Sequence, residues 1–258
     1  MILDKIVAKK KQEVAELRVN GISLPAQFRE TAIAPPRGFR QALISYHGVA
    51  VIAEVKKASP SKGVICEDFR PVEIAVNYKR NGAQAISVLT DVDFFQGSLL
   101  YLLQVRDAVD LPVLRKDFII DELQIREASV HGADAILLIA AILDRYQLRD
   151  FQAYAGEFGM DILIEVHNEQ ELDMALAADS QLIGINNRNL NDFTVDIETT
   201  FRLKKHIPSD IPVVSESGLK NRDDIKRLQD EGVTAALIGE TLMRAGTDCD
   251  VLRGLRDE

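Results

Sequence analysis

Short apolar runs recur along the chain at intervals of roughly 20–34 residues, and each is followed by a segment with helical spacing of its apolar positions. The runs are five or six residues long, which is the length of a buried strand. Strands that alternate with helical segments in this way predict βαβ units and a parallel sheet. The eight predicted strands are residues 51–56, 85–90, 112–116, 135–139, 162–166, 182–186, 212–216 and 235–239.

A weak internal repeat marks the junctions between helices and strands. In three places a glycine directly after a helical segment is followed by small residues that lead into a strand, and a glycine there supplies a left-handed helix cap. Helix starts are marked as well, by Pro71 at a first helical position and by Asp121 and Asp144 at capping positions. The glycines of the repeat are Gly82, Gly132 and Gly232.

These patterns predict a single α/β domain over residues 1–258, a (β/α)8 TIM barrel with an N-terminal helical extension. The extension covers residues 1–48 and the barrel residues 49–258. A chain of 258 residues is long enough for such a barrel. An amphipathic helix over residues 1–18, rather than a signal peptide, opens the extension. A doubly wound open sheet is the alternative, but no glycine-rich dinucleotide turn follows the first strand.

The first predicted strand carries two charges. Glu54 and Lys56 are two residues apart, so they share one face of the strand with Ile52. A carboxylate and an ammonium on the inner side of a hydrophobic strand are costly unless they are paired or used. The pair is therefore either a structural ion pair or part of a site.

Polar residues also end four other predicted strands. Catalytic groups of a TIM barrel lie at the carboxyl ends of its strands, and the alternation of side chains points each of these residues inward. Two lysines, three glutamates and an asparagine at one rim predict a catalytic acid–base cluster, with a stabilising polar plug as the alternative. The cluster is Glu54, Lys56, Lys116, Glu165, Asn186 and Glu216.

The loops after the seventh and eighth strands suggest the chemistry of the ligand. They contain Ser217-Gly218 and Gly239-Glu240, at the positions where barrels commonly bind phosphate through backbone N–H groups and a helix start. Glu240 is expected to contribute its amide rather than its side chain. The sequence thus predicts a phosphate site.

Composition narrows the class of protein. The chain is 47% hydrophobic and 28% charged, as in globular proteins, and its net charge of −9 argues against a general nucleic-acid or anionic-membrane binder. No apolar stretch approaches the ~18 residues of a membrane span. Two lone cysteines, Cys66 and Cys249, indicate a reducing compartment. The four histidines are scattered and are interpreted as structural or surface residues.

Residues 52–63, IAEVKKASPSKG, resemble the signature of the indole-3-glycerol phosphate synthase family. The resemblance implies a (β/α)8 barrel that catalyses the decarboxylating ring closure of tryptophan biosynthesis in the cytoplasm, without a metal or organic cofactor. Some members are fused to a second barrel; since this chain stops at Glu258, we expect it to be monofunctional. Further matching segments are SVLT (87–90), FQGS (95–98), LRKDF (114–118), LLI (137–139), IEV (164–166), GINNR (184–188), SESG (215–218), LIG (237–239) and LMR (242–244).

The resemblance implies a role for each residue of the acid–base cluster. Lys116 is the acid that polarises a carbonyl group, and Glu165 and Lys56 share the later proton transfers and the dehydration, in an order that stays open. Glu54 orients the lysines and favours their charged forms. Asn186 positions the substrate, and Glu216 belongs to the same catalytic set.

The resemblance also implies the binding residues for an anthranilate ring, an opened ribulose chain and a phosphate. Arg188 suits a carboxylate through its planar guanidinium. The phosphate is expected at Ser59, Gly218, Gly239 and Glu240, and Pro60 and Ser217 are further expected substrate-binding residues. The apolar walls for the ring are expected from Phe95, Phe118, Leu137, Leu190 and Leu237.

Two other functions remain open at this point. One is a sugar-phosphate aldolase that uses Lys116 as a Schiff-base nucleophile, and the other is a catalytically silent barrel that binds a phosphorylated ligand or a protein. For the synthase we expect a phosphorylated small-molecule substrate and no nucleic-acid or membrane partner. We expect a monomer that could associate with other enzymes of tryptophan biosynthesis. The first helix and the loop 57–63 are expected to cover the bound substrate.

Overall fold

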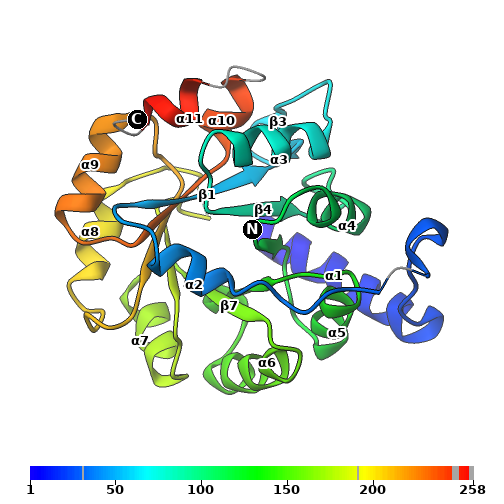
Figure 1. Ribbon diagram of the computed structural model, residues 1–258. Coiled ribbons are helices and arrows are strands. Elements are labelled where there is room, and N and C mark those ends of the chain that lie inside the picture. The colour runs from blue at the N-terminus through cyan, green and yellow to red at the C-terminus, as the bar shows by residue number, and fades with distance from the viewer. Residues whose placement is uncertain (31, 191, 246–249, 256–258) are drawn as a thin grey trace.

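The computed structural model describes residues 1–30, 32–190, 192–245 and 250–255, and a closed barrel of eight parallel strands forms its centre (Figure 1). The last strand of the barrel pairs with the first, so the alternative of an open sheet is excluded and the predicted TIM barrel is confirmed. Each strand lies within one residue of its predicted bounds. The strands are β1 (Ala50–Val55), β4 (Ala85–Leu89), β5 (Val113–Lys116), β6 (Ala135–Ile139), β7 (Asp161–Val166), β8 (Ile183–Asn186), β9 (Val213–Glu216) and β10 (Ala235–Ile238).

Helices surround the barrel and begin where the sequence predicts (Figure 1). Pro71 is the first residue of its helix, and the side chains of Asp121 and Asp144 accept hydrogen bonds from backbone N–H groups of theirs. The helices are α1 (Ile2–Asn20), α2 (Phe39–Ile44), α3 (Pro71–Arg80), α4 (Leu99–Ala108), α5 (Glu122–Val130), α6 (Arg145–Glu157), α7 (Glu169–Ala177), α8 (Glu198–Lys204), α9 (Arg222–Asp230), α10 (Glu240–Ala245) and α11 (Asp250–Gly254), with 3₁₀ turns η1 (Ala26–Phe28) and η2 (Ala140–Ile142).

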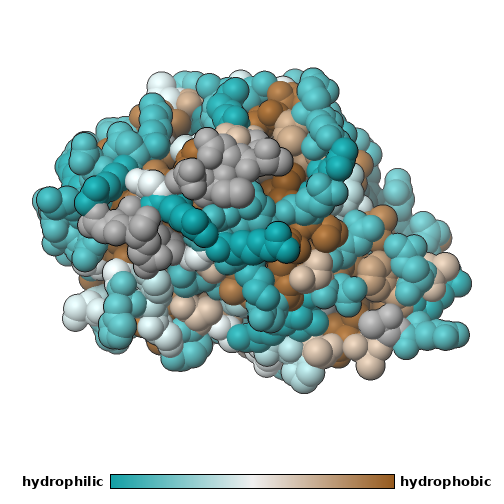
Figure 2. Space-filling model, turned by 45° about the horizontal axis from the view of Figure 1, so that its top comes forward, coloured by the Kyte–Doolittle hydropathy of each residue, from teal (hydrophilic) through white to brown (hydrophobic). Residues whose placement is uncertain are grey.

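The face of the molecule drawn in Figure 2 is mainly polar. Figure 2 shows hydrophilic residues over most of the visible face, with hydrophobic ones between them. Among the described residues, no helix is both long enough and apolar enough to cross a membrane.

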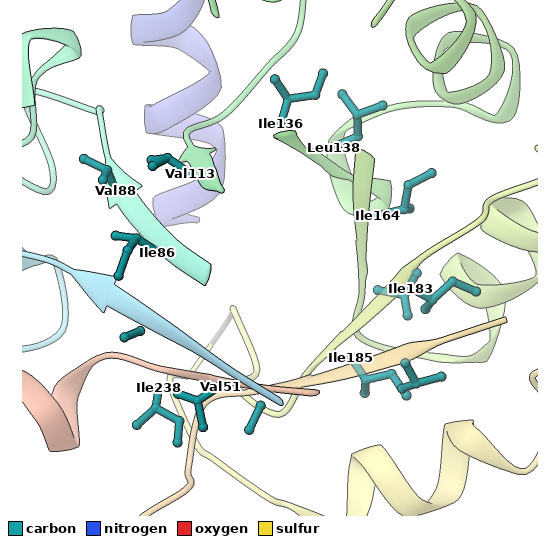
Figure 3. Packing of buried hydrophobic residues seen from close by; sticks show 14 of the residues in the cluster. Val51, Ile86, Val88, Val113, Ile136, Leu138, Ile164, Ile183, Ile185 and Ile238 are labelled. Carbon is teal, nitrogen blue, oxygen red and sulfur yellow. The ribbon is translucent and has the colours of Figure 1, made fainter. Parts of the chain in front are cut away.

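Two hydrophobic layers hold the barrel together. Outward-facing residues such as Val51, Ile86 and Ile164 pack between the strands and the helices (Figure 3). Inward-facing residues such as Ile52, Leu114 and Leu163 fill the barrel interior. Because strand side chains alternate, the polar residues that continue the inward rows lie above this apolar filling, at the carboxyl ends of the strands.

The segment after β1 differs from its prediction. The structure ends β1 at Val55 but forms a short antiparallel hairpin from β2 (Ala58–Ser59) and β3 (Gly63–Val64), where the sequence predicts only a loop. The residues between the two strands make the turn, and Gly63 adopts a positive φ of 66° that a glycine tolerates. The hairpin adds backbone hydrogen bonds to the rim of the barrel.

Helix α1 is fixed to the rim by a buried cation. The Lys10 side chain is almost fully buried, and its Nζ lies 2.8 Å from Asp91 Oδ2 and 2.9 Å from Asp117 Oδ1. Burial alone would lower the pKa of Lys10, but Asp117 and Asp91 outweigh it and raise that pKa. Asp91 and Asp117 come just after the carboxyl ends of β4 and β5 in the chain. Lys10 therefore ties α1 to the end of the barrel where the polar residues gather.

Candidate active site

A cavity of about 650 Å³ opens at the carboxyl ends of the strands, a volume suited to a small metabolite. Helix α1 also contributes Ile2, Leu3 and Ile6 to its lining. The structure thus brings all of the predicted site residues to one cavity. They are Glu54, Lys56, Ser59, Pro60, Phe95, Lys116, Phe118, Leu137, Glu165, Asn186, Arg188, Leu190, Glu216, Ser217, Gly218, Leu237, Gly239 and Glu240.

Lys116 lies at the base of the cavity between two carboxylates. Its Nζ donates a hydrogen bond to Glu165 Oε2 at 3.1 Å and lies 3.4 Å from Glu216 Oε2. Burial alone would lower the pKa of Lys116, but Glu165, Glu216 and Glu54 outweigh it and raise that pKa. Lys116 is therefore held as an ammonium ion, which can polarise a carbonyl oxygen and donate a proton.

The two glutamates beside Lys116 differ in their protonation. Burial raises the pKa of Glu165, yet Lys116 and His167 lower it well below its usual range. Burial also raises the pKa of Glu216, and the nearby charges of Glu165 and Glu54 raise it further, against the opposing effect of Lys116. The pKa of Glu216 is thereby raised to about 8. Near neutral pH, Glu165 is thus a carboxylate and Glu216 a neutral acid.

Glu54 and Lys56 form an ion pair on the inner side of the barrel. Gly239, at the end of β10, makes room for them, because a Cβ atom at that position would overlap the Glu54 carboxylate and lie 3.1 Å from Lys56 Nζ. Gly184 in β8 leaves space for Glu216 in the same way. The glycines at these two strands are therefore required by the charged groups beside them.

One wall of the cavity is aromatic. The ring centroids of Phe95 and Phe118 lie 5.9 Å apart with an interplanar angle of 36°. Asp91 Oδ1 accepts a hydrogen bond from the N–H of Phe95 at 3.1 Å, and Asp117 Oδ1 accepts one from the N–H of Phe118 at 2.8 Å. The two aspartates that bind Lys10 thus also hold the backbone of this wall.

The opposite end of the cavity carries cations. Arg244 Nε donates a hydrogen bond to Glu240 Oε1 at 3.0 Å, and Lys62 and Arg188 approach the same carboxylate at 3.8 and 3.9 Å. The sequence predicts that Glu240 contributes only its amide, whereas the structure turns its side chain toward these three cations. The spacing of Arg244 four residues after Glu240 on a helix is a signal that could have revealed this contact.

The loop after β9 has a constrained backbone. Ser217 adopts a φ of 67° and Gly218 a φ of 85°. A left-handed conformation is unfavourable for serine, and residues held in it often lie at binding sites. The two residues line the cavity beside the cations, where the sequence predicts a bound anion.

His167 lies outside the cavity lining but contacts Glu165, and the sequence does not identify this contact. The interpretation of the histidines as structural or surface residues leaves it out, but the structure places its Nε2 3.4 Å from Glu165 Oε1. The available signal is position: a residue two after Glu165 in a strand faces the same side.

Other candidate chemistry is limited. Cys66 is a half-buried free thiol away from the cavity lining, and Cys249 lies outside the described residues. Within the described ranges, no group of three acidic, histidine or cysteine side chains is arranged to hold a metal ion.

Comparison with known sequences gives one consistent family. A sequence model described as "Indole-3-glycerol phosphate synthase" matches residues 3–254. A protein of that name from Desulfotalea psychrophila is 68% identical over 254 residues, covering 98% of both chains. The one from Chlorobium phaeovibrioides is 53% identical and the match covers 93% of both chains. The one from Leptothrix cholodnii is 51% identical, and the match covers 95% of this chain and 94% of the relative.

Solved structures with low identity share the fold. KGPDC from Streptococcus mutans superposes with a TM-score of 0.63 at 14% identity, covering 82% of this chain and 97% of its own. N-acetylmannosamine-6-phosphate 2-epimerase from Clostridium perfringens gives 0.60 at 15% identity, covering 78% and 90%. At this level of identity the likeness concerns the barrel alone.

Proposed function

The chain belongs to the indole-3-glycerol phosphate synthase family, and on this premise we propose how its cavity carries out the reaction. The protein is a carboxy-lyase of tryptophan biosynthesis with a phosphorylated small-molecule substrate. It converts 1-(2-carboxyphenylamino)-1-deoxyribulose 5-phosphate into indole-3-glycerol phosphate, carbon dioxide and water. The observation that carries the mechanism is the buried Lys116 side chain, whose Nζ lies between the carboxyl groups of Glu165 and Glu216.

The substrate has an aromatic end and an anionic end, and the cavity has an aromatic wall and a cationic end to receive them. The anthranilate ring would lie against the wall of Phe95 and Phe118, with Leu137, Leu190 and Leu237 around it. Its phosphate would bind at the other end, to Ser59 and to backbone amides of 217–218 and 239–240, with Lys62 and Arg244, which face Glu240, nearby. Lys56 and Arg188 would hold the ring carboxylate, and Asn186 the opened ribulose chain.

Ring closure requires that the C2′ carbonyl become electrophilic. Lys116 would donate its proton to the carbonyl oxygen as the ring carbon that bears the carboxylate attacks C2′. The new carbon–carbon bond interrupts the aromatic ring, and the loss of carbon dioxide restores it. A fixed ammonium in a buried site supplies this stabilisation without reorganisation of solvent.

Dehydration completes the indole. The C2′ hydroxyl must leave as water, and the neighbouring carbon must lose a proton. Glu165 would accept that proton, since it is held as a carboxylate, and the ammonium of Lys56 would protonate the departing hydroxyl. Glu54 would orient Lys56 through their ion pair.

The aldolase hypothesis fits the site less well. A Schiff-base lysine must be a neutral amine when it attacks a carbonyl carbon. Burial lowers the pKa of Lys116, but the neighbouring glutamates raise it by more, so the charged ammonium is favoured. Borohydride added to a mixture of protein and substrate should therefore trap no covalent adduct, and a trapped adduct at Lys116 would support the aldolase.

The direct test is to incubate the purified protein with the substrate and to follow indole fluorescence. We expect a rising signal that saturates with substrate concentration. Substrate binding without any signal would instead support the silent barrel. We further propose that the enzyme acts in the cytoplasm as a monomer that could associate with other enzymes of the pathway. Sedimentation equilibrium would reveal a dimer if this is wrong.

A further inference from the structure

A line of charged side chains runs from helix α7 to the centre of the cavity. Glu171 Oε2 lies 2.9 Å from His167 Nδ1, and His167 Nε2 lies 3.4 Å from Glu165 Oε1. Glu165 Oε2 in turn accepts the hydrogen bond of Lys116. His167 is thus placed directly behind Glu165, on the side opposite Lys116, and the proposed function assigns it no role.

Glu171 is held so that its charge faces the imidazole. Besides His167 Nδ1, its carboxylate accepts hydrogen bonds from the N–H of His167 at 2.8 Å and from Asn168 Nδ2 at 2.6 Å. It also lies in the first turn of α7, where negative charge is favoured. A carboxylate only accepts hydrogen bonds, so Nδ1 carries a proton.

The other ring nitrogen faces Glu165. His167 Nε2 is buried, has no geometrically well-formed hydrogen bond within the described structure, and lies 3.4 Å from Glu165 Oε1. With one carboxylate on each side of the ring, the protonated imidazole is favoured. Burial alone would lower the pKa of His167, but Glu165 and Glu171 outweigh it and raise that pKa to about 10.

We propose that His167 is a positioning residue: a permanent cation, held by Glu171, that makes Glu165 rather than Glu216 the ionised carboxylate beside Lys116. This inference rests on the proposed function, in which Glu165 accepts a proton. The two glutamates share Lys116, but among the residues that the structure describes only Glu165 forms a second ion pair, with His167. Glu216 faces the like charges of Glu165 and Glu54, and its Oε1 has no hydrogen-bond partner among the described residues.

The proposal explains why the pair has one defined base. Two carboxylates that share one ammonium compete for a single proton, and a small difference in their surroundings decides which one takes it. Without His167 the preference of the proton for Glu216 would be weaker, and Glu165 would take up a proton at a higher pH.

The test is the substitution His167→Asn. The Asn side-chain amide can keep the contact with Glu171 but is too short to reach Glu165 and carries no charge. Loss of one nearby cation moves the pKa of a carboxylate up by about one to three units. We therefore expect the acid limb of the kcat profile to move to higher pH by about one to three units, with KM within about twofold.

Two further variants separate this role from a structural one. Glu171→Gln keeps the imidazole but removes its outer carboxylate, so it should move the acid limb of the kcat profile in the same direction by a smaller amount. His131→Asn replaces a buried histidine whose Nδ1 contacts the backbone oxygen of Glu127 and should leave the kcat profile unchanged. A His167→Asn enzyme that loses thermal stability but keeps the wild-type kcat and pH profile would overturn the proposal, as would a change in KM alone.

A measurement without substrate distinguishes this inference from the proposed function. In proton NMR the imidazole resonance that His167→Asn removes should keep its protonated shift until the pH approaches 10. Titration near the usual value of about 6.5 would refute the permanent cation, even in an enzyme that makes indole. The expected titration in a protein without turnover would refute only the proposed function.

Discussion

The buried ion cluster around Lys10 allows a quantitative prediction for Lys10→Met. Methionine keeps the length and most of the apolar stem of lysine but removes the charge. Asp91 and Asp117, both buried, are then left near each other without the cation that lies 2.8 and 2.9 Å from them. Arg115 still contacts Asp117 at 3.1 Å, so the loss of Lys10 destabilises the Asp91 carboxylate more than that of Asp117.

The magnitude follows from the cost of an unpaired buried charge. Each Lys10–aspartate contact contributes several kcal/mol of attraction even at an effective dielectric constant of about 20, and desolvation offsets much of this. Breaking a buried pair by removing one partner typically costs about 3–5 kcal/mol. For a protein of this size that corresponds to a fall of roughly 6–20 °C in the midpoint of thermal unfolding.

Urea unfolding of Lys10→Met beside Lys10→Arg measures this cost. Arginine keeps the charge, so it should recover part of the lost stability. Because Asp91 and Asp117 also hold the backbone of Phe95 and Phe118, we expect KM of Lys10→Met to rise more than kcat falls.

The cost should also depend on pH in a defined direction. Burial raises the pKa of Asp117, but Lys10 and Arg115 lower it well below the ordinary value of about 3.9. A depressed pKa stabilises the fold above the unfolded value, and this contribution is lost as the pH falls. The difference between wild type and Lys10→Met should therefore be full above about pH 5 and shrink below about pH 4. A difference under about 1 kcal/mol at neutral pH would show that the cluster does not hold α1 in place.

Three further variants test other parts of the site. Gly239→Ala should lower kcat/KM by about 10²-fold with the fold retained, because the new methyl group displaces the Glu54–Lys56 pair; a wild-type rate would contradict this. The pKa of Glu216 is raised to about 8, so its ionisation as the pH rises destabilises the fold. Glu216→Gln should therefore be more stable than wild type above pH 8 and close to wild type below pH 4. A constant difference in melting temperature across this range would argue against the raised pKa. Deletion of residues 1–19 should weaken substrate binding, since α1 lines the cavity; unchanged affinity with lower stability would make the extension purely structural.

The strands and the inward-facing rim residues can be predicted from the sequence because both follow from short-range periodicity. Glu165 and Lys116 interrupt apolar runs with the parity of the barrel interior, so their direction is fixed once the strands are. The closure of the barrel is then the consequence of eight such units.

Other features depend on how distant segments meet, and local patterns do not contain that information. Lys10 stands between Lys9 and Lys11 in a run of charges that is typical of a solvated helix face. Only the docking of α1 onto the ends of β4 and β5 decides that Lys10 is the buried one. Likewise, the side chain of Glu240 faces Lys62 and Arg188 from two distant segments, which spacing along the chain does not reveal.

The central claim is that the ammonium of Lys116 activates the carbonyl group, and Lys116→Ala tests it most directly. The substrate should still bind, because the aromatic wall and the cationic end are unchanged, so its dissociation constant should stay within about tenfold of wild type. Single-turnover formation of indole should slow by about 10²–10⁴-fold, the usual contribution of a general acid. A rate within threefold of wild type, with the substrate bound equally well, would contradict the account.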